Sequence, residues 1–352
     1  MKPLGQQPSL DGLRALAIIA VVAVHAGFLR SGVLAVDFFF VLSGFLITTL
    51  LLDEHARTGT LSLRSFHVRR ATRLVPALWL LLVAYVAWAA LQGGALGSPS
   101  HVAGAAAVGA GFVANFFATA WSPHQAQYLA HLWSLAEEEQ FYVVWPLLLA
   151  LLLRRRCSTR AVLTGLGAVV AMVTVERWLL ALGGASTSRI AFAPDTNLDG
   201  LTIGCAAAFA RSGLGWRPTR AAGAAALAAV VLLGLVFPEL AGGDRSFTLP
   251  VAAPAFPAAC AVVIVFLVSG ESLASRALGV QPLRYVGRAS YGIYLWHLPL
   301  MHAAGVPFGL LLTTVAAAVS YRYVEAPVRR LGRRWTQHAQ RTPAGVPGYA
   351  AS

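Results

Sequence analysis

Charged residues are scarce in this sequence. Only 12% of the 352 residues are Asp, Glu, Lys or Arg, whereas ordinary soluble domains carry about 25%. Hydrophobic residues make up 57% of the chain, and its mean hydropathy is +0.67. This composition excludes an ordinary soluble domain and predicts a multi-pass protein of the cell membrane, surrounded by the lipid bilayer.

Cysteine and acidic residues are scarce as well. The three cysteines, Cys157, Cys205 and Cys260, lie far apart in or beside apolar sequence, so we expect neither a disulfide framework nor a metal site. Against 27 basic residues there are 14 acidic ones, which gives a net charge of +13. In a soluble protein that excess would indicate nucleic-acid binding. Here the basic residues lie between apolar runs, so we expect no nucleic-acid partner.

The basic residues gather in five clusters, at 57–73, 154–160, 211–220, 276–288 and 322–341. Such clusters mark cytoplasmic loops, and loops on one side are separated by an even number of crossings, so we predict about ten spans and cytoplasmic chain ends. Of the three runs between Arg73 and Arg154, we expect the Ala/Gly-rich 102–120 not to cross. The eleven apolar runs are 13–29, 33–52, 74–92, 102–120, 141–153, 161–182, 198–211, 221–240, 248–268, 286–303 and 304–321.

The spans are predicted to be helices, because unpaired backbone groups are not tolerated in hydrocarbon and the runs lack the alternation of barrel strands. The fold class is therefore all-α, a polytopic transmembrane helical bundle formed by residues 1–334. Residues 335–352 lack an apolar face and are predicted to be a disordered cytoplasmic tail. A cleaved signal peptide is the alternative for run 13–29, but Arg14 and His25 inside it favour a retained helix.

Arg14 and His25 are the first candidates for a functional site, because ionisable groups inside an apolar run are costly. Their spacing of eleven residues brings them within about 20° of one helix face, roughly 16 Å apart along the axis. The arginine suits an anionic group, and a neutral histidine suits accepting a hydroxyl proton near pH 7. The residues alone equally allow a helix-packing histidine and an arginine that extends to the interface.

The second run and the loop after it supply further candidates. Asp37 is either a site residue or an interfacial aspartate at a helix N-terminus, and the small residues Ser43 and Gly44 permit close helix approach. The segment FHVRRATRLVPALW carries Arg70 and Arg73 in a cationic patch. That patch could bind phosphates from the cytoplasm or serve only as a topological anchor.

Three consecutive glutamates, Glu137 to Glu139, precede the fifth run. The helix dipole explains them in part, and such carboxylates can also orient a histidine and stabilise its cation. Farther on, the segment APDTNLDGLTIG carries Asp195 and Asp199 into an apolar run.

Two C-terminal motifs are also polar. Tyr291, Tyr294 and His297 follow one another at i, i+3 spacing on one helix stripe, a pattern that is more often helix–helix hydrogen bonding than chemistry. Glu325, among arginines, is expected to form a surface ion pair.

Together, six segments resemble the membrane acyltransferase family 3, whose members O-acylate cell-surface polysaccharides, peptidoglycan, lipid-linked sugars and macrolide antibiotics. The resemblance covers nearly the whole chain and implies the stand-alone form, without a C-terminal hydrolase-like domain. The segments are LDGLRALAIIAVVAVHAG, VDFFFVLSGFLI, FHVRRATRLVPALW, WSLAEEEQFYVVWP, VGRASYGIYLWHLPLM and SYRYVEAPVRR.

The resemblance implies roles for individual residues. His25 would be the essential catalytic residue, Arg14 would support the donor or the histidine, and Arg70 and Arg73 would bind acyl-CoA at the cytoplasmic face. Glu138 and Glu139 align with the paired glutamates of the family. Where the family pattern has arginine, this chain has Asn197, which puts in doubt any role of that loop in holding an anionic acceptor.

The sequence thus predicts an O-acyltransferase that moves an acyl group, by default acetyl, from acyl-CoA to a hydroxyl of a carbohydrate, glycolipid or macrolide. His25 would act as the base, or form an acyl-histidine, and a glutamate would stabilise its cation. No permanently bound cofactor and no metal are expected. The rivals are a secondary transporter or flippase with buried Arg, His and Asp along its path, and a scaffold without chemistry. Further cavity candidates are Asp11, Asp37, Ser43, His131, Trp133, Asp199, Tyr291, Tyr294 and His297.

Overall fold

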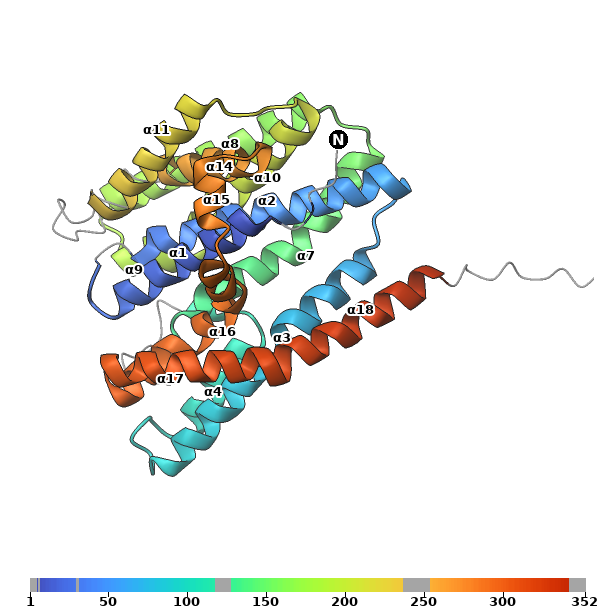
Figure 1. The fold of residues 1–352 in the computed structure, drawn as a ribbon. Coiled ribbons are helices and arrows are strands. Elements are labelled where there is room, and N and C mark those ends of the chain that lie inside the picture. The colour runs from blue at the N-terminus through green and yellow to red at the C-terminus, as the bar shows by residue number, and fades with distance from the viewer. Residues whose placement is uncertain (1–4, 6, 30–31, 118–127, 237–253, 342–352) are drawn as a thin grey trace, which may run out of the picture.

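A computed structural model describes residues 5, 7–29, 32–117, 128–236 and 254–341. These residues form helices joined by short connections, and no strand occurs among them (Figure 1). The all-α fold class is therefore confirmed for the described part of the chain. The helices are α1 (Pro8–His25), α2 (Gly32–Thr58), α3 (Leu63–Leu91), α4 (Pro99–Ala110), α5 (Ala114–Phe117), α7 (Leu132–Arg154), α8 (Thr159–Leu182), α9 (Thr187–Phe192), η1 (Pro194–Thr196), α10 (Leu198–Gly213), α11 (Arg220–Val231), η2 (Leu232–Val236), α14 (Ala255–Ser269), α15 (Leu273–Leu278), α16 (Gln281–Ala304), α17 (Val306–Val319), η3 (Ser320–Glu325) and α18 (Ala326–Arg341).

Four helical segments are long and apolar enough to cross a membrane: α1, Leu34–Thr58 of α2, α3 and α8. Two shorter apolar helical segments, Arg220–Val236 and Ala255–Ser269, fall in the predicted runs 221–240 and 248–268, of which 237–240 and 248–253 lie outside the described residues. The run 102–120 forms the 12-residue α4 and the 4-residue α5. Residues 118–120 of this run lie outside the described residues, and our expectation that the run does not cross the membrane stays a prediction.

Several helices begin at a serine or threonine whose side chain accepts a hydrogen bond from the first turn. Ser62 caps α3, Ser158 caps α8 and Thr219 caps α11. Such caps satisfy backbone N–H groups that have no partner inside the helix. Each cap is followed within two residues by Arg64, Arg160 or Arg220, so three of the basic clusters reach a helix start.

The described helices pack around two larger apolar cores, and a third core joins α2, α3, α7, α8 and α10. One of the larger cores joins the group α2, α10, α11 and α14, and the other joins the group α3, α4, α7 and α16. Helix α1 contacts both α2 and α16 and so connects the two groups. A Cβ atom at Gly44 would overlap the Leu201 carbonyl oxygen, and one at Gly204 would overlap that of Val41. The close approach predicted at Gly44 is thus confirmed, between α2 and α10.

The C-terminal elements differ from expectation in two respects. Helix α18 continues to Arg341 and lies alongside α3 (Figure 1), so it extends into the segment that we predicted to be disordered. Residues 342–352 lie outside the described residues. The prediction of a surface ion pair at Glu325 is wrong, because η3 packs against α3 and α16 and buries this side chain. Ser320 donates a hydrogen bond to it, at 3.3 Å.

Candidate active site

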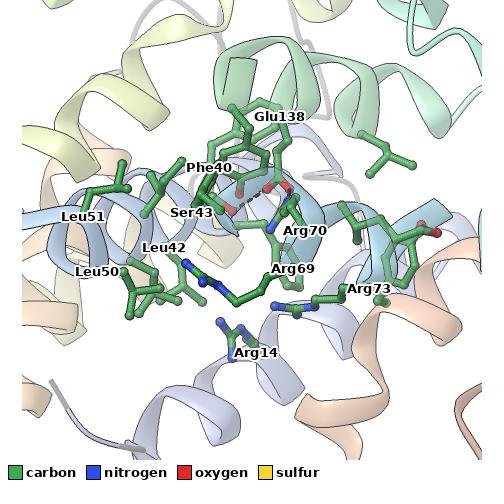
Figure 2. Close-up of a pocket in the computed structure, with 18 of the residues that line it drawn as sticks. Arg14, Phe40, Leu42, Ser43, Leu50, Leu51, Arg69, Arg70, Arg73 and Glu138 are labelled. Carbon is green, nitrogen blue, oxygen red and sulfur yellow. Dashed lines mark hydrogen bonds and ion pairs between the residues drawn. The ribbon is translucent and has the colours of Figure 1, made fainter. Parts of the chain in front are cut away.

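A cavity of about 980 Å³ lies where the two groups of helices meet. Side chains of α1, α2, α3, α7, α16 and α18 line it, some charged and some apolar (Figure 2). Its charged lining is unbalanced, because six arginines face two glutamates, Glu54 and Glu138. The cavity therefore carries an excess of positive charge. The arginines are Arg14, Arg57, Arg69, Arg70, Arg73 and Arg329.

Three of these arginines lie in one part of the cavity. Figure 2 shows the guanidinium groups of Arg14 and Arg73 near each other, whereas that of Arg69 points toward Leu42 and Leu50. Arg14 donates a hydrogen bond to Asp11 at 3.1 Å, and Arg69 is 3.9 Å from Glu54. Arg73 has no hydrogen bond or ion pair with any described residue. Guanidinium groups bind phosphate and carboxylate in bidentate fashion, so this part of the cavity is suited to a multiply charged anion.

Arg70 differs from its neighbours because its charge is compensated. Its Nε atom donates to Glu139 at 3.0 Å and its Nη2 atom to Glu138 at 3.2 Å. The guanidinium also lies 3.6 Å from the ring centre of Tyr142. Ser43 donates to the other oxygen of Glu138 at 2.7 Å (Figure 2). Both glutamates are thus held by Arg70, whereas we had expected one of them to orient the catalytic histidine.

The remaining walls of the cavity are largely apolar. Phe40, Leu46 and Leu50 of α2 line one side, and the lining at the far end of α1 includes Val21. Such a surface suits an uncharged, flexible arm of a ligand whose charged end binds the arginines.

His25 lies one helical turn beyond Val21, at the exposed end of α1. It is not among the residues that line the cavity, so Arg14 lines it as predicted and His25 is adjacent to it. The Nδ1 atom of His25 is 3.0 Å from the carbonyl oxygen of Val21 and 3.1 Å from Nε2 of His297. His25 therefore has a side-chain partner in His297, on α16.

Two of the other candidates, His131 and Tyr294, have rings that contact the ring of His297. Tyr291 and Tyr294 line the cavity; the hydroxyl of Tyr291 donates to the Leu74 carbonyl at 2.8 Å, and that of Tyr294 contacts the His131 carbonyl. The His131 ring is buried and its Nε2 atom is 3.2 Å from the Leu295 carbonyl oxygen. Trp133 is buried too and meets Phe40 edge to face.

Two buried aspartates among the predicted candidates are not part of the cavity lining. Asp199 is fully buried and accepts two hydrogen bonds from Arg177, at 2.6 and 2.7 Å. Asp37 is also buried, with an Oδ1 atom that has no hydrogen-bond partner among the described residues. The sequence analysis missed Arg177. Like Arg14, it is an ionisable residue inside an apolar run, in this case 161–182, and could have been selected on that ground.

Comparison with known protein families shows which family this chain belongs to. A family model described as an acyltransferase domain matches residues 7–321. The chain belongs to this acyltransferase family. The resemblance of the sequence motifs is therefore confirmed, and the matched region includes every candidate residue of the cavity except Arg329.

Curated proteins similar to this family member are O-acetyltransferases by name. It is 32% identical over 357 residues to the peptidoglycan O-acetyltransferase OatA of Listeria monocytogenes, covering 92% of this chain and 56% of that protein. For the putative peptidoglycan O-acetyltransferase YrhL of Bacillus subtilis the identity is 32%, with 93% and 55% covered. For the O-acetyltransferase OatA of Staphylococcus aureus it is 31%, with 92% and 57% covered.

The chain thus spans just over half the length of these relatives. No solved structure matches it significantly. Among the residues that the structure describes, no group of three or more His, Cys, Asp or Glu side chains could hold a metal ion.

Proposed function

We propose that the protein is a membrane O-acetyltransferase that moves an acetyl group from acetyl-CoA to a hydroxyl of a sugar. The proposal rests on membership of the acyltransferase family and, within the fold, on one observation. That observation is the cavity with more arginines than carboxylates, which ends one helical turn from His25.

The donor would bind in the cavity with its phosphates against the arginines. Arg14, Arg69 and Arg73 supply positive charge that the carboxylates lining the cavity do not balance, and a polyphosphate would neutralise it. The pantetheine arm would then follow the apolar wall toward Val21. Arg70 would contribute less charge than we first expected, because Glu138 and Glu139 already bind it.

In the proposed reaction His25 removes the proton from the acceptor hydroxyl while the oxygen of that hydroxyl attacks the thioester carbonyl carbon. The C–S bond breaks, the coenzyme A thiolate leaves, and the proton held by the imidazole returns to the thiolate. General-base assistance of this kind typically contributes about 10²–10⁴-fold. An acyl-histidine intermediate is the alternative, in which the imidazole itself attacks the thioester before the hydroxyl does.

The acceptor is proposed to be a sugar hydroxyl of the peptidoglycan type. The names of the Listeria and Bacillus relatives support this choice. Glycolipid and macrolide hydroxyls are the other acceptors that the sequence resemblance allows, and an acceptor panel with radiolabelled acetyl-CoA distinguishes the three.

We further propose ten spans with both chain ends in the cytoplasm, formed by α1, α2, α3, α7, α8, α10, α11, α14, α16 and α17. The arginines at the starts of α3, α8 and α11 support this topology. Cys157 tests it, because this exposed cysteine follows α7 and the other two are buried. An impermeant maleimide should label it in inverted vesicles and not in intact cells; the reverse result would contradict the topology.

The enzymatic proposal is tested with protein purified in detergent or reconstituted in vesicles. Wild-type protein should release coenzyme A from acetyl-CoA and transfer acetyl to the acceptor, and His25→Ala should abolish both. His101→Ala is the matched control, since His101 is exposed on α4 and lies outside the cavity. Acetyl transfer retained in His25→Ala would overturn the catalytic role. Substrate movement without coenzyme A release would favour the rival transporter function.

A further inference from the structure

His25 and His297 face each other through ring nitrogens, although they are 272 residues apart in the sequence. Their ring centres are 5.0 Å apart, and the short contact joins Nδ1 of His25 to Nε2 of His297. A neutral imidazole carries one N–H and one lone pair, so the neighbours of each nitrogen determine which atom carries the proton.

The backbone determines the tautomer of His297. Its Nδ1 atom lies 2.7 Å from the carbonyl oxygen of Tyr294 and 3.2 Å from that of Ile293. Carbonyl oxygens only accept hydrogen bonds, so Nδ1 must be the protonated nitrogen. The lone pair of His297 is therefore on Nε2, the atom that faces His25.

The same reasoning applies to His25. Its Nδ1 atom is 3.0 Å from the carbonyl oxygen of Val21 and 3.1 Å from the lone pair of His297. Both neighbours are acceptors, so Nδ1 of His25 carries the hydrogen and its lone pair is on Nε2. We infer that His297 is a positioning residue that holds His25 in the Nδ1–H tautomer, so that Nε2 is the nitrogen that accepts the proton of the acceptor hydroxyl.

This inference rests on the proposed function of His25 and assigns to His297 the part that a carboxylate plays in serine hydrolases. When His25 becomes an imidazolium, its Nδ1–H still has an acceptor in His297, which stabilises the cation. A neutral acceptor also suits the place, because His297 is 0% exposed and an unpaired buried carboxylate would be costly there. It further explains why Glu138 and Glu139 are available to bind Arg70.

The kinetic test compares two variants of His297 under conditions where donor and acceptor are varied separately. His297→Phe removes the acceptor and keeps a ring of similar size, so kcat should fall by about 10²-fold, the lower end of a general base's contribution. The KM for acetyl-CoA should not change, because the donor would bind the arginines. His297→Gln offers a side-chain oxygen to Nδ1 of His25 and should recover part of the lost kcat.

The control is His302→Phe, because His302 lies on the same helix and is exposed; its kcat and KM should match the wild type. Unchanged kcat in His297→Phe, or a His297→Gln variant that is no better than His297→Phe, would overturn the inference. If His297 had a purely structural role, both variants would give less folded protein, and the kcat of His297→Gln would not exceed that of His297→Phe.

A spectroscopic test needs no activity and no stable His297 variant. Solid-state NMR of wild-type protein with ¹⁵N-labelled histidine, with a His25→Gln difference spectrum for assignment, reports which nitrogen of His25 is protonated. We expect a protonated Nδ1 and an unprotonated Nε2; the opposite pattern would overturn the inference. If His25→Ala retains acetyl transfer while the tautomer is as expected, the proposed function fails and the assigned geometry stands.

Discussion

Arginines lie inside the helical bundle in two regions that differ in charge balance. In the cavity, six arginines face two glutamates, and Arg73 has no ion pair with a described residue. Between α8 and α10, Arg177 meets Asp199 through two short hydrogen bonds, with side chains that are 4% and 0% exposed. The first region is open and unbalanced, and the second is sealed and matched.

The difference separates a binding site from a structural contact. In the buried pair, each side chain already uses its hydrogen-bonding groups on the other and cannot bind a ligand. The attraction between the two charges mainly offsets the free energy that each loses when it leaves water. An open group of arginines gains energy only when an anion enters. A charged residue in an apolar run can therefore be assigned to a binding site only when its partners are known. Asp199, which the sequence made a candidate, pairs with Arg177 and belongs to the structural contact.

Removing one partner of the sealed pair should produce the largest loss of stability. Arg177→Ala leaves Asp199 buried and unpaired, so we expect the free energy of unfolding to fall by about 3–5 kcal/mol. Thermal unfolding in detergent, followed by circular dichroism, measures the loss. The double variant Arg177→Met with Asp199→Leu removes both charges and should recover most of it. An Arg177→Ala protein as stable as wild type would contradict the structural role.

Removing one arginine of the open group should act on binding and not on stability. Arg73→Ala loses a charged contact to the donor worth about 1.5–3 kcal/mol, so the KM for acetyl-CoA should rise roughly 10- to 10²-fold. The unfolding temperature should not fall, because Arg73 has no hydrogen bond or ion pair among the described residues.

Arg330→Ala is the control for that experiment. Arg330 is exposed on α18, outside the cavity, so its loss should change neither KM nor stability. A loss of stability in Arg73→Ala with unchanged KM would reverse the comparison and make the open group structural.

The sequence was sufficient for the fold class and for features that depend on near neighbours. Apolar runs predicted the helices, Gly44 predicted a close helix contact, and the i, i+3 spacing correctly placed Tyr291 and His297 on one helix. Each of these follows from local periodicity or from the size of one side chain.

Pairings between distant residues could not be predicted in this way. Arg70 binds Glu138, 68 residues away, and His25 meets His297, 272 residues away. Periodicity gives the face of a helix that carries a residue, but the relative position of two packed helices depends on all of their contacts. Glu325 was misassigned for the same reason, because its burial is caused by α3 and α16 and not by its own segment.

The smallest effect is expected at a third arginine, which lies at the surface. Arg189 of α9 donates two hydrogen bonds to Asp195 and lies 3.6 Å from Glu176, with side chains 34%, 46% and 33% exposed. This pair is as well matched as the buried one, but water screens it. Arg189→Ala should therefore cost less than about 1 kcal/mol of stability at neutral pH.

Acid should remove even that small contribution of Arg189. Partial burial alone would raise the pKa of Asp195, but the hydrogen bonds and charge of Arg189 outweigh it, and the pKa is lowered from 3.8. The pair therefore stabilises the fold above the unfolded pKa, and this contribution is lost as the pH falls through the folded value. Thermal unfolding of wild type and Arg189→Ala should differ slightly at pH 7 and coincide at low pH. A difference as large as that of Arg177→Ala would show that matched geometry, and not burial, determines the cost of losing an arginine in this protein.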